Sequence, residues 1–463
     1  MINDTPIIKT FVHNGRYYLY DAFSNSLFEI NKGQYYEIQL LKRIGINEYL
    51  ALNKNDKQYQ DIVMLINRGL LKYSFISEIE HPATKNINAY LDRGIHEIVL
   101  QITKDCNFKC RYCLFANDTN TNRTHEKINM SFETAKSCVD FLYEHSADVN
   151  VVNISFYGGE PLLNFETIRK VVEYANNKFS SKKIAYSMTI NGSLLTDSVV
   201  EFIVKNDFRI AISLDGPKNI QNKHRKFLGS GKGTFDVVYK CINDLKKDYK
   251  DYFEKSVSFL PVVIDDEKYD NVLKFFLEAG IPEEKISPSK ANFSGVDYIY
   301  ADLGSNNSSI KSLSKESDDI NKSNIKRLNA LYENKGIIPA KWHHNGQCIP
   351  GVNRLFVDVN GEFYPCEKVV EDGTLSIGNI KIGFDLDKVI NLMNIGKITE
   401  DECKSCWAVH FCEICAMMCA DIESPMISRE RKLSICEAQK STALWFFKRY
   451  INDTLDKPKY NFE

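Results

Sequence analysis

The stretch that decides the fold is Glu97–Phe115, EIVLQITKDCNFKCRYCLF. An apolar run typical of a buried strand, Glu97–Thr103, leads into three cysteines, Cys106, Cys110 and Cys113, spaced C-x3-C-x2-C. Polar residues on both sides of the first cysteine interrupt the strand pattern, so we expect the three thiols on a loop. A structural zinc site needs four protein ligands. Three thiolates without an adjoining fourth ligand leave one metal position open, as in an iron–sulfur cubane whose last iron binds a small chelating ligand.

Outward from this stretch, strand and helix patterns alternate from Gly94 to about residue 300. The alternation predicts an α/β fold, either a barrel or an open parallel sheet, with ligands at the C-terminal ends of the strands. The expected strands are Glu97–Thr103, Val151–Phe156, Ile184–Ile190, Arg209–Leu214, Ser256–Val263 and Lys285–Pro288, and the expected helices are Ser131–Glu144, Phe165–Phe179, Thr196–Asn206, Phe235–Tyr249 and Lys268–Ala279.

Turn-rich motifs follow the second, third and fourth of these strands, at the edge where the cysteines also lie. Their glycines allow close approach of the backbone to a ligand, and Glu160 offers a carboxylate to an ammonium group. The motifs are Tyr157-Gly158-Gly159-Glu160-Pro161, Thr189-Ile190-Asn191-Gly192 and Ser213-Leu214-Asp215-Gly216-Pro217, the last followed by His224-Arg225.

Together these motifs resemble the radical S-adenosylmethionine (SAM) enzymes. The resemblance implies a partial (β/α)6 TIM-type barrel over about residues 94–300, with a [4Fe–4S] cluster whose open iron binds SAM. It implies Cys106, Cys110 and Cys113 as cluster ligands, Tyr112 near the adenine, and Gly158, Gly159 and Glu160 around the methionine ammonium. It also implies Asn191, Ser213, Asp215 and Arg225 along the ribose and carboxylate. No catalytic acid or base is identified.

A second set of thiols lies near the C-terminus. Eight cysteines match two four-ligand sites, and Gly361 could supply a tight turn that aims Cys366. Two zinc ribbons are the alternative interpretation. The eight are Cys348, Cys366, Cys403, Cys406, Cys412, Cys415, Cys419 and Cys436.

This second set resembles the SPASM extension of peptide-modifying radical SAM proteins, with two departures. Cys415 comes after two intervening residues rather than three, and Cys419 is an extra thiol. The resemblance implies two auxiliary iron–sulfur clusters of the [4Fe–4S] kind. Cys403, Cys406, Cys412 and Cys436 would hold one, and Cys348 and Cys366, with Cys415 or Cys419 or both, would hold the other.

The first 90 residues read as strands at 7–14, 16–22 and 26–31 followed by helices at 33–44 and 58–68. Such a unit could offer an edge strand to an extended peptide, or it could serve in packing or dimerisation. It resembles the winged-helix-like recognition element that binds the leader of ribosomally made peptides. The expected division is therefore 1–92 for peptide recognition, 93–320 for the barrel and 321–463 for the SPASM domain, with a polar linker at 304–323 and helices near 324–334 and 443–450.

Composition sets limits on the interpretation. The chain has 463 residues, 13 cysteines and a formal net charge of −2, which gives no signature of nucleic-acid or membrane binding. No signal peptide or spanning segment is read, so we expect a cytoplasmic protein with reduced thiols. Cys138 and Cys241 are expected to be buried, inert helix residues. His343-His344 could contribute a metal ligand, but a solvated pair is expected.

The combined pattern resembles maturases that form thioether cross-links, the sactipeptide and ranthipeptide synthases. It implies that a 5′-deoxyadenosyl radical joins a cysteine sulfur to a carbon of a precursor peptide, with a flavodoxin- or ferredoxin-type electron donor. Carbon–carbon cross-linking and formylglycine formation on a sulfatase are alternatives within the same enzyme class. A non-catalytic iron–sulfur protein is the alternative of another class, but it would not need an ammonium-binding Glu160.

Overall fold

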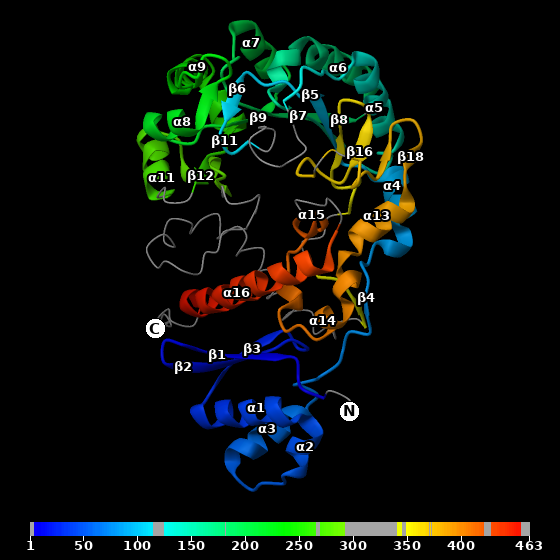
Figure 1. Cartoon of the computed structure of the whole chain (residues 1–463), viewed down its shortest axis with the longest axis vertical. Coiled ribbons are helices and arrows are strands. Elements are labelled where there is room, and N and C mark those ends of the chain that lie inside the picture. The colour runs from blue at the N-terminus through cyan, green and yellow to red at the C-terminus, as the bar shows by residue number, and fades with distance from the viewer. Residues whose placement is uncertain are drawn as a thin grey trace, which may run out of the picture.

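The computed structural model describes residues 4–113, 125–180, 182–264, 269–291, 340–344, 349–369, 371, 373–420 and 427–454. Cys348, the expected linker at 304–323 and the expected helix near 324–334 lie outside these residues. The molecule is elongated, with the barrel at one end, the N-terminal unit at the other and the cysteine-rich C-terminal region between them (Figure 1).

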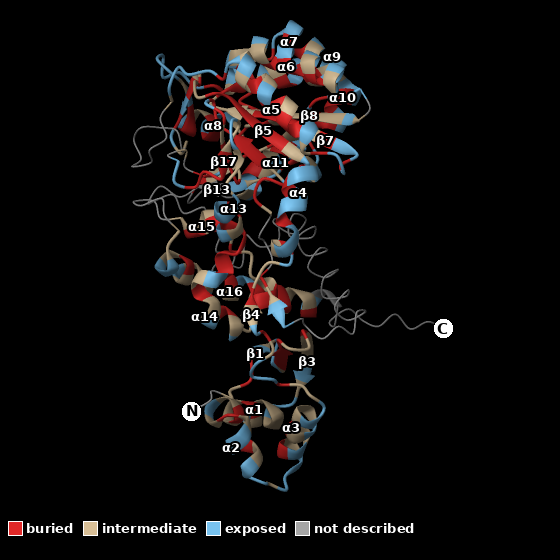
Figure 2. Ribbon diagram, turned by 90° about the vertical axis from the view of Figure 1, so that its right-hand side faces the viewer, coloured by how far each residue is buried: buried red, intermediate tan, exposed pale blue. Residues whose placement is uncertain are grey.

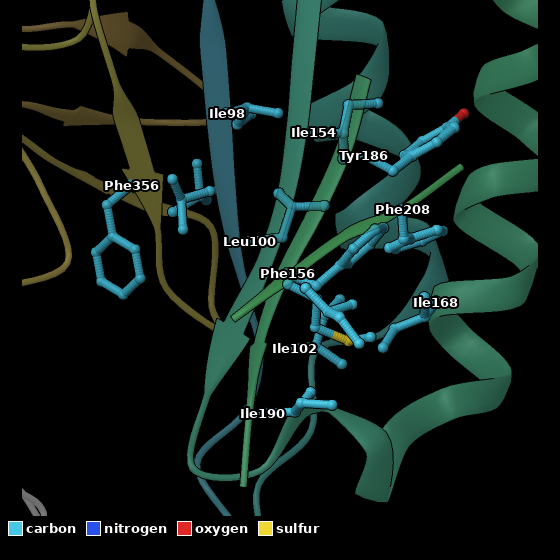
Figure 3. Packing of buried hydrophobic residues seen from close by; sticks show 14 of the residues in the cluster. Ile98, Leu100, Ile102, Ile154, Phe156, Ile168, Tyr186, Ile190, Phe208 and Phe356 are labelled. Atoms are coloured by element: carbon cyan, nitrogen blue, oxygen red, sulfur yellow. The ribbon is translucent and has the colours of Figure 1, made fainter. Parts of the chain in front are cut away.

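The barrel region is built on parallel strands that neighbour one another in chain order. Alternate residues of β5 face opposite ways, and Ile98, Leu100 and Ile102 pack with Ile154 and Phe156 beneath the covering helices (Figure 3). The strands are β5 (Glu97–Thr103), β7 (Val151–Gly158), β8 (Lys183–Ile190), β9 (Arg209–Ile212) and β11 (Val257–Phe259), and the helices are α5 (Phe132–Glu144), α6 (Phe165–Lys178), α7 (Asp197–Lys205), α8 (Lys218–His224), α9 (Phe235–Asp248), α10 (Lys250–Ser256) and α11 (Tyr269–Glu278).

The last two predicted strands differ from expectation. The predicted strand Ser256–Val263 is divided into β11 and β12 (Val262–Ile264), because Pro261 has no N–H to donate to a sheet. The predicted strand Lys285–Pro288 is replaced by a 3-10 turn, Glu283–Lys285, and by β13 (Ser289–Ala291), which pairs with β12 in a separate two-stranded sheet. The expected sixth barrel strand therefore does not join the main sheet.

Strands from the C-terminal region extend the main sheet instead. β15 (Leu355–Val357) runs parallel beside β5, and a short antiparallel ladder continues outward to give nine strands in mixed directions. Gly361 turns the chain at a φ of 92°, where an added Cβ would lie 2.7 Å from Ile380 Cγ2, so the expected tight turn before Cys366 is confirmed. The ladder comprises β16 (Glu362–Tyr364), β17 (Gly378–Asn379) and β18 (Gly383–Phe384).

Helices complete the C-terminal region. The terminal helix α16 (Arg429–Thr454) is much longer than the predicted 443–450, since only its second half carries the apolar residues that the prediction used. Its first half holds Lys432 and Cys436. The other helical segments are α13 (Leu386–Met393), η5 (Ile395–Thr399), α14 (Glu400–Lys404), η6 (Val409–Phe411) and α15 (Ala416–Cys419).

The N-terminal unit confirms the predicted order of strands and helices. Three antiparallel strands pack one face against the following helices through Leu19, Ile38 and Ile62. Asn14 and Gly15 both have positive φ, as a two-residue hairpin turn requires. The elements are β1 (Ile8–His13), β2 (Arg16–Asp21), β3 (Ser26–Ile30), α1 (Lys32–Ile44), α2 (Ile46–Ala51) and α3 (Lys57–Asn67).

The opposite face of this sheet is covered by the C-terminal region. The ring centroid of Tyr20 lies 4.6 Å from that of Phe447 on α16 and 5.8 Å from that of Phe411. Nε2 of the buried His410 ring lies 3.0 Å from the carbonyl oxygen of Ala22. Buried residues of β1, β2 and α16 thus form one core. Figure 2 colours parts of β1 and α16 as buried.

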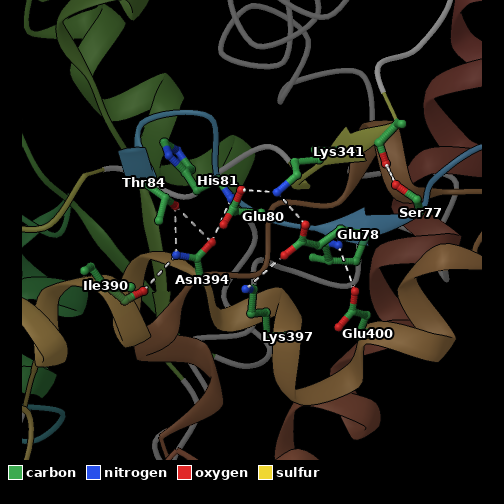
Figure 4. A network of polar contacts seen from close by, with 12 residues as sticks. Ser77, Glu78, Glu80, His81, Thr84, Lys341, Ile390, Asn394, Lys397 and Glu400 are labelled. Carbon is green, nitrogen blue, oxygen red and sulfur yellow. Dashed lines mark hydrogen bonds and ion pairs between the residues drawn. The ribbon is translucent and has the colours of Figure 1, made fainter. Parts of the chain in front are cut away.

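The connection from the N-terminal unit to the barrel runs along the C-terminal region. β4 (Glu78–Ile79) pairs in parallel with β14 (Lys341–Trp342), and Lys341 forms ion pairs with Glu78 at 2.6 Å and Glu80 at 3.0 Å (Figure 4). Further along, the Asn394 side chain accepts a hydrogen bond from the His81 backbone N–H at 2.7 Å. η1 (Thr84–Asn86) and α4 (Ile87–Arg93) then lead into the barrel.

The expectation that His343 and His344 are solvated is wrong. Both rings are buried, and burial lowers the pKa of His343 to about 4. His343 Nε2 accepts the backbone N–H of Gly396 at 3.2 Å, so Nδ1 carries the proton and donates to the His344 carbonyl at 3.0 Å. The pair thus joins the segment after β14 to η5, a contact that the local sequence does not indicate.

Within the described ranges, no helix combines the length and the apolar character needed to cross a membrane.

Candidate functional site

The cysteine loop begins where β5 ends. Cys106 and Cys110 are buried and Cys113 is partly exposed. The loop is more regular than expected, because Phe108–Cys110 forms a short strand, β6, which pairs antiparallel with β10 (Arg225–Phe227). This pairing sets Arg225 directly opposite Cys110.

The three thiols lie close enough to act on one another electrostatically. Burial, and then the charges of Glu160 and the other two thiols, raise the pKa of Cys106, while a hydrogen bond from the backbone N–H of Phe108 at 3.4 Å opposes the rise. Burial raises the pKa of Cys110 to about 12. Three mutually repelling thiols, two of them buried, are unfavourable as thiolates unless a positive group joins them. The donor set therefore fits an iron–sulfur cluster.

Gly158 and Gly159 bring the end of β7 against the cysteine loop. An added Cβ would lie 2.0 Å from the Thr103 carbonyl oxygen at Gly158 and 2.1 Å from the Asp105 carbonyl oxygen at Gly159. The backbone N–H of Gly159 donates to Thr103 at 3.0 Å. The glycines thus allow close approach, but in this structure the approach is to the loop that carries Cys106.

Glu160 is a buried carboxylate at the end of β7. Its Oε2 accepts the backbone N–H of Asn191 at 2.7 Å, and Oε1 accepts that of Leu162 at 3.2 Å. Burial nevertheless raises its pKa to about 7. In the described part of the chain no Lys or Arg forms an ion pair with it. A ligand ammonium would supply the missing positive charge, so the residue fits its predicted role.

Tyr112, Asp215 and Arg225 form one buried network beside the cysteines. Tyr112 donates to Asp215 Oδ2 at 2.5 Å, and Arg225 Nε donates to the same oxygen at 3.0 Å. The Arg225 guanidinium lies 5.2 Å from the centroid of the Tyr112 ring, and its Nη1 lies 4.0 Å from Cys110 Sγ. The structure therefore brings these predicted residues together, but it ties them to each other and to the cysteine loop.

Asn191 and Ser213 lie at the ends of the next two strands. The Asn191 side chain donates to Asn107 Oδ1 at 2.7 Å and accepts from the backbone N–H of Ser193 at 2.9 Å. Ser213 is partly buried, and its backbone N–H donates to the Ile190 carbonyl at 2.9 Å. Asn107 was missed as a site residue, although its place between two cysteines of the motif could have drawn attention to it.

His125 is another residue that the motif does not contain. Its Nε2 lies 3.7 Å from Cys113 Sγ, and its Nδ1 lies 3.2 Å from the Lys104 carbonyl oxygen. Burial lowers the pKa of its imidazole. Because no motif signal marks this position, only the folded chain could place it near the thiols.

Four of the C-terminal thiols lie within one another's electrostatic reach. Burial raises the pKa of Cys406 to about 11 and that of Cys412 to about 12, and the charge of Cys403 acts on both. Cys403 also acts on the pKa of Cys436, which burial raises. These four are the set predicted for one auxiliary cluster.

The remaining C-terminal thiols are described only in part. Burial raises the pKa of Cys419 to about 12, with contributions from Cys415 and Cys436. Cys366 follows β16, but Cys348 lies outside the described residues, so the second predicted set is not assembled here. Among the described residues, no three His, Cys, Asp or Glu side chains are arranged to hold a single metal ion.

The two cysteines predicted to be inert, Cys138 and Cys241, differ in how far they are buried. Cys138 on α5 is completely buried, as predicted, and burial raises its pKa. The prediction of a buried thiol is wrong for Cys241 on α9, which is only partly buried.

Comparison with known proteins agrees with the site. Residues 100–279 match the Radical SAM superfamily, and this range holds all the residues predicted for SAM and its cluster. The chain therefore carries a radical SAM enzyme domain.

Similarity extends beyond that domain. The cysteine-type anaerobic sulfatase-maturating enzyme of Clostridium perfringens is 26% identical over 379 residues, which cover 77% of this chain and 97% of that protein. The radical SAM cyclopropyl synthase TigE of Paramaledivibacter caminithermalis is 26% identical over 248 residues, or 50% of this chain. The chain spans about half the length of TigE and of one further curated relative.

A solved structure shares the fold. The AdoMet-bound structure of native anSMEcpe aligns with a TM-score of 0.55 and 23% identity, and the alignment covers 78% of this chain and 100% of that one.

Proposed function

We propose that this chain is a radical SAM maturase that installs thioether cross-links, from cysteine sulfur to carbon, in a ribosomally made precursor peptide. The observation that carries the proposal is the coexistence of two thiol groups in one chain. One includes Cys106 and Cys110 beside the buried Glu160. The other includes Cys403, Cys406 and Cys412 in the C-terminal region, where the charge of Cys406 acts on Tyr20 of the N-terminal sheet.

The barrel site would hold SAM and its cluster. Cys106, Cys110 and Cys113 would ligate a [4Fe–4S] cluster, and Glu160 would receive the methionine ammonium. When reduced with SAM bound, this cofactor pair supplies a carbon-centred radical that removes a hydrogen atom from a substrate. Arg225 would offset negative charge near Cys110, at a separation of 4.0 Å.

The N-terminal sheet would bind the leader of the peptide. β2 is the central strand, so β3 is an edge strand, and within the described residues it pairs only with β2. An extended peptide could add to this edge by main-chain hydrogen bonds. Tyr36 on α1 and Met64 on α3 are exposed apolar side chains of the same unit.

The C-terminal thiols would hold auxiliary [4Fe–4S] clusters. A thioether replaces one C–H and one S–H bond by a C–S bond. One hydrogen atom would pass to the SAM-derived radical, the sulfur would lose a proton, and a cluster held by these thiols would accept the remaining electron. Thiolate ligation by iron suits a cysteine-containing substrate. A flavodoxin- or ferredoxin-type protein would supply the electron that starts the reaction.

Formylglycine formation is the second candidate. It is favoured by the match to 97% of the length of a cysteine-type sulfatase-maturating enzyme, although 23% of this chain lies beyond that match. Carbon–carbon bond formation is a third outcome. A non-catalytic electron carrier is disfavoured, because it has no need of a buried carboxylate such as Glu160.

Anaerobic reconstitution with iron and sulfide tests the cofactors first. Three clusters predict about 12 iron atoms per chain, and tightly bound zinc would contradict the proposal. The chain should then be incubated with SAM, a reductant and a cysteine-containing peptide encoded next to it.

The product identifies the reaction. A thioether predicts loss of two hydrogens per cross-link and a cysteine that no longer reacts with iodoacetamide. A formylglycine product would instead react with a hydrazide, and an alkylatable cysteine in a product lacking two hydrogens would indicate a carbon–carbon bond. Either of these would refute the thioether proposal.

A further inference from the structure

Lys432 is a buried lysine in the first half of α16. Lys432 is only 1% exposed, and it lies one helical turn before Cys436. In the described part of the chain, no Asp or Glu forms an ion pair with it. A buried ammonium without a nearby anion is unfavourable, so this position calls for a negatively charged partner.

The Lys432 ammonium contacts the sulfur of Cys403 and the hydroxyl of Thr399. Its Nζ donates to Thr399 Oγ1 and lies 3.4 Å from Cys403 Sγ. Thr399 Oγ1 itself lies 3.3 Å from Cys403 Sγ. Since the hydroxyl accepts from the ammonium, its own proton is available to the sulfur. Cys403 thus has two side-chain donors, and Thr399 is as deeply buried as Lys432.

Cys403 differs in its backbone contacts from three of the other predicted ligands. In Cys106, Cys406 and Cys412, the sulfur receives the backbone N–H of the residue two positions later. Cys403 lies within α14, where the following N–H groups point back along the helix axis. Its sulfur therefore cannot use a neighbouring N–H in this way, and side chains must provide the donors.

The charge of Lys432 also reaches beyond Cys403. It acts on Cys412, Cys419 and Cys436, which come from three different segments of the C-terminal region. No other buried lysine is found among the described residues. Lys432 is therefore a buried positive charge that contacts Cys403 and lies within electrostatic reach of three further thiols.

We propose that Lys432 is a positioning residue for the auxiliary cluster, and that its ammonium, with Thr399, donates to the Cys403 sulfur and raises the reduction potential of that cluster. The inference rests on the auxiliary cluster of the proposed function. A positive charge and hydrogen bonds to ligand sulfur stabilise the more negative, reduced cluster, so their removal lowers the potential.

Potentiometric titration followed by electron paramagnetic resonance tests this role. The background is the full chain with Cys106, Cys110 and Cys113 changed to alanine, so that only auxiliary clusters contribute. At the potential where this background is half reduced, Lys432→Met should lower the ratio of reduced to oxidised cluster about tenfold, equivalent to about 59 mV for one electron. Lys432→Gln, which keeps a neutral N–H donor, should give a smaller decrease.

Lys440→Met is the matched control on the same helix. The Lys440 charge also acts on Cys406 and Cys436, but its side chain is 33% exposed and pairs with Glu437 at 2.7 Å. Solvent screening should keep its effect well below that of Lys432→Met.

The outcomes distinguish failure of the proposed role of Lys432 from failure of the proposed auxiliary cluster. Full iron content with equal potentials in the background and both Lys432 variants overturns the role of Lys432 alone. Absence of iron from the three-alanine background overturns the auxiliary cluster and this inference together. If Lys432→Met folds without retaining iron, Lys432→Gln carries the measurement.

Discussion

The hydroxyl of Tyr112 donates a 2.5 Å hydrogen bond to the carboxylate of Asp215, which lies 103 positions away in the sequence. Tyr112 belongs to the cysteine motif that follows β5, and Asp215 follows β9. In the sheet, β7 and β8 lie between these two strands. Through Arg225 the same carboxylate is linked to Cys110. The cysteine loop is thus held in place by the end of a distant strand, and several predictions about the site depend on this.

Asp215→Asn should destabilise the chain strongly. The Asp215 carboxylate is completely buried, and its loss leaves the buried Arg225 guanidinium without its ion-pair partner, at a cost of about 3–5 kcal/mol. Chemical denaturation measures the change. The control is Asp207→Asn, whose ion pair with Lys255 is about two-thirds exposed and should cost at most about 1 kcal/mol. Equal losses in the two variants would contradict the proposed network.

SAM binding should weaken as the pH falls below 7. Burial raises the pKa of Glu160 to about 7, and only the ionised carboxylate can pair with an ammonium. Below pH 7 the free carboxyl holds a proton that SAM must displace, so Kd should rise about tenfold per pH unit, while above pH 7 it should level off. Isothermal calorimetry on reconstituted protein measures this.

Glu160→Gln should weaken SAM binding and abolish this pH dependence. The matched control is Glu166→Gln, because the Glu166 side chain is 60% exposed on α6. A pH profile that Glu160→Gln leaves unchanged would assign the titration to another group.

Gly159→Ala should prevent the cysteine loop from closing. The added methyl group would lie 2.1 Å from the Asp105 carbonyl oxygen, so the end of β7 and the loop must move apart. We expect about four fewer iron atoms per chain after reconstitution. Gly229→Ala is the control, since that glycine also has a demanding φ of 82° but no heavy atom near its would-be Cβ. Full iron content in Gly159→Ala would show that the close approach is dispensable.

Cys110→Ala should remove the SAM cluster while leaving the auxiliary ones. The expected result is a loss of about four iron atoms and of reductive SAM cleavage. Cys138→Ala serves as the control because that thiol is buried within α5 and is not one of the predicted cluster ligands. Continued formation of deoxyadenosine by Cys110→Ala would contradict the ligand assignment.

Phe447→Ala should loosen the N-terminal unit as well as α16. The Phe447 ring is buried and packs 4.6 Å from the Tyr20 ring, so its removal should cost about 3–5 kcal/mol. Thermal denaturation with hydrogen exchange locates the loss. A decrease confined to α16, with unchanged exchange in β1 and β2, would show that the shared core contributes little.

This packing also changes how peptide binding should be tested. Deleting residues 1–90 would expose the buried Phe446, Phe447 and Ile451, so the truncated chain is not a clean probe of recognition. Hydrogen exchange of the intact chain is better suited. Addition of the cysteine-containing peptide should slow exchange of the amides in Ser26–Ile30, and equal exchange with and without peptide would argue against strand addition at β3.

The sequence by itself determined the local features of this protein. Strand and helix positions in the barrel follow from short-range periodicity, and the C-x3-C-x2-C motif marks its cysteines because their spacing is a local property. The same reasoning predicted the N-terminal strands and the turn at Asn14-Gly15. It was less accurate at β12 and β13, where pairing between distant segments decides which residues extend the sheet.

Only the tertiary structure decided which distant residues share an environment. His343 and His344 are polar in the sequence, but packing buries them. Lys432 is not part of any sequence motif, and its proposed role is visible only because α16 places its ammonium beside the Cys403 sulfur. Burial, hydrogen bonding and electrostatic interaction depend on separations in space, which spacing along the chain does not encode, and for this reason the surroundings of the predicted ligands emerged only from the fold.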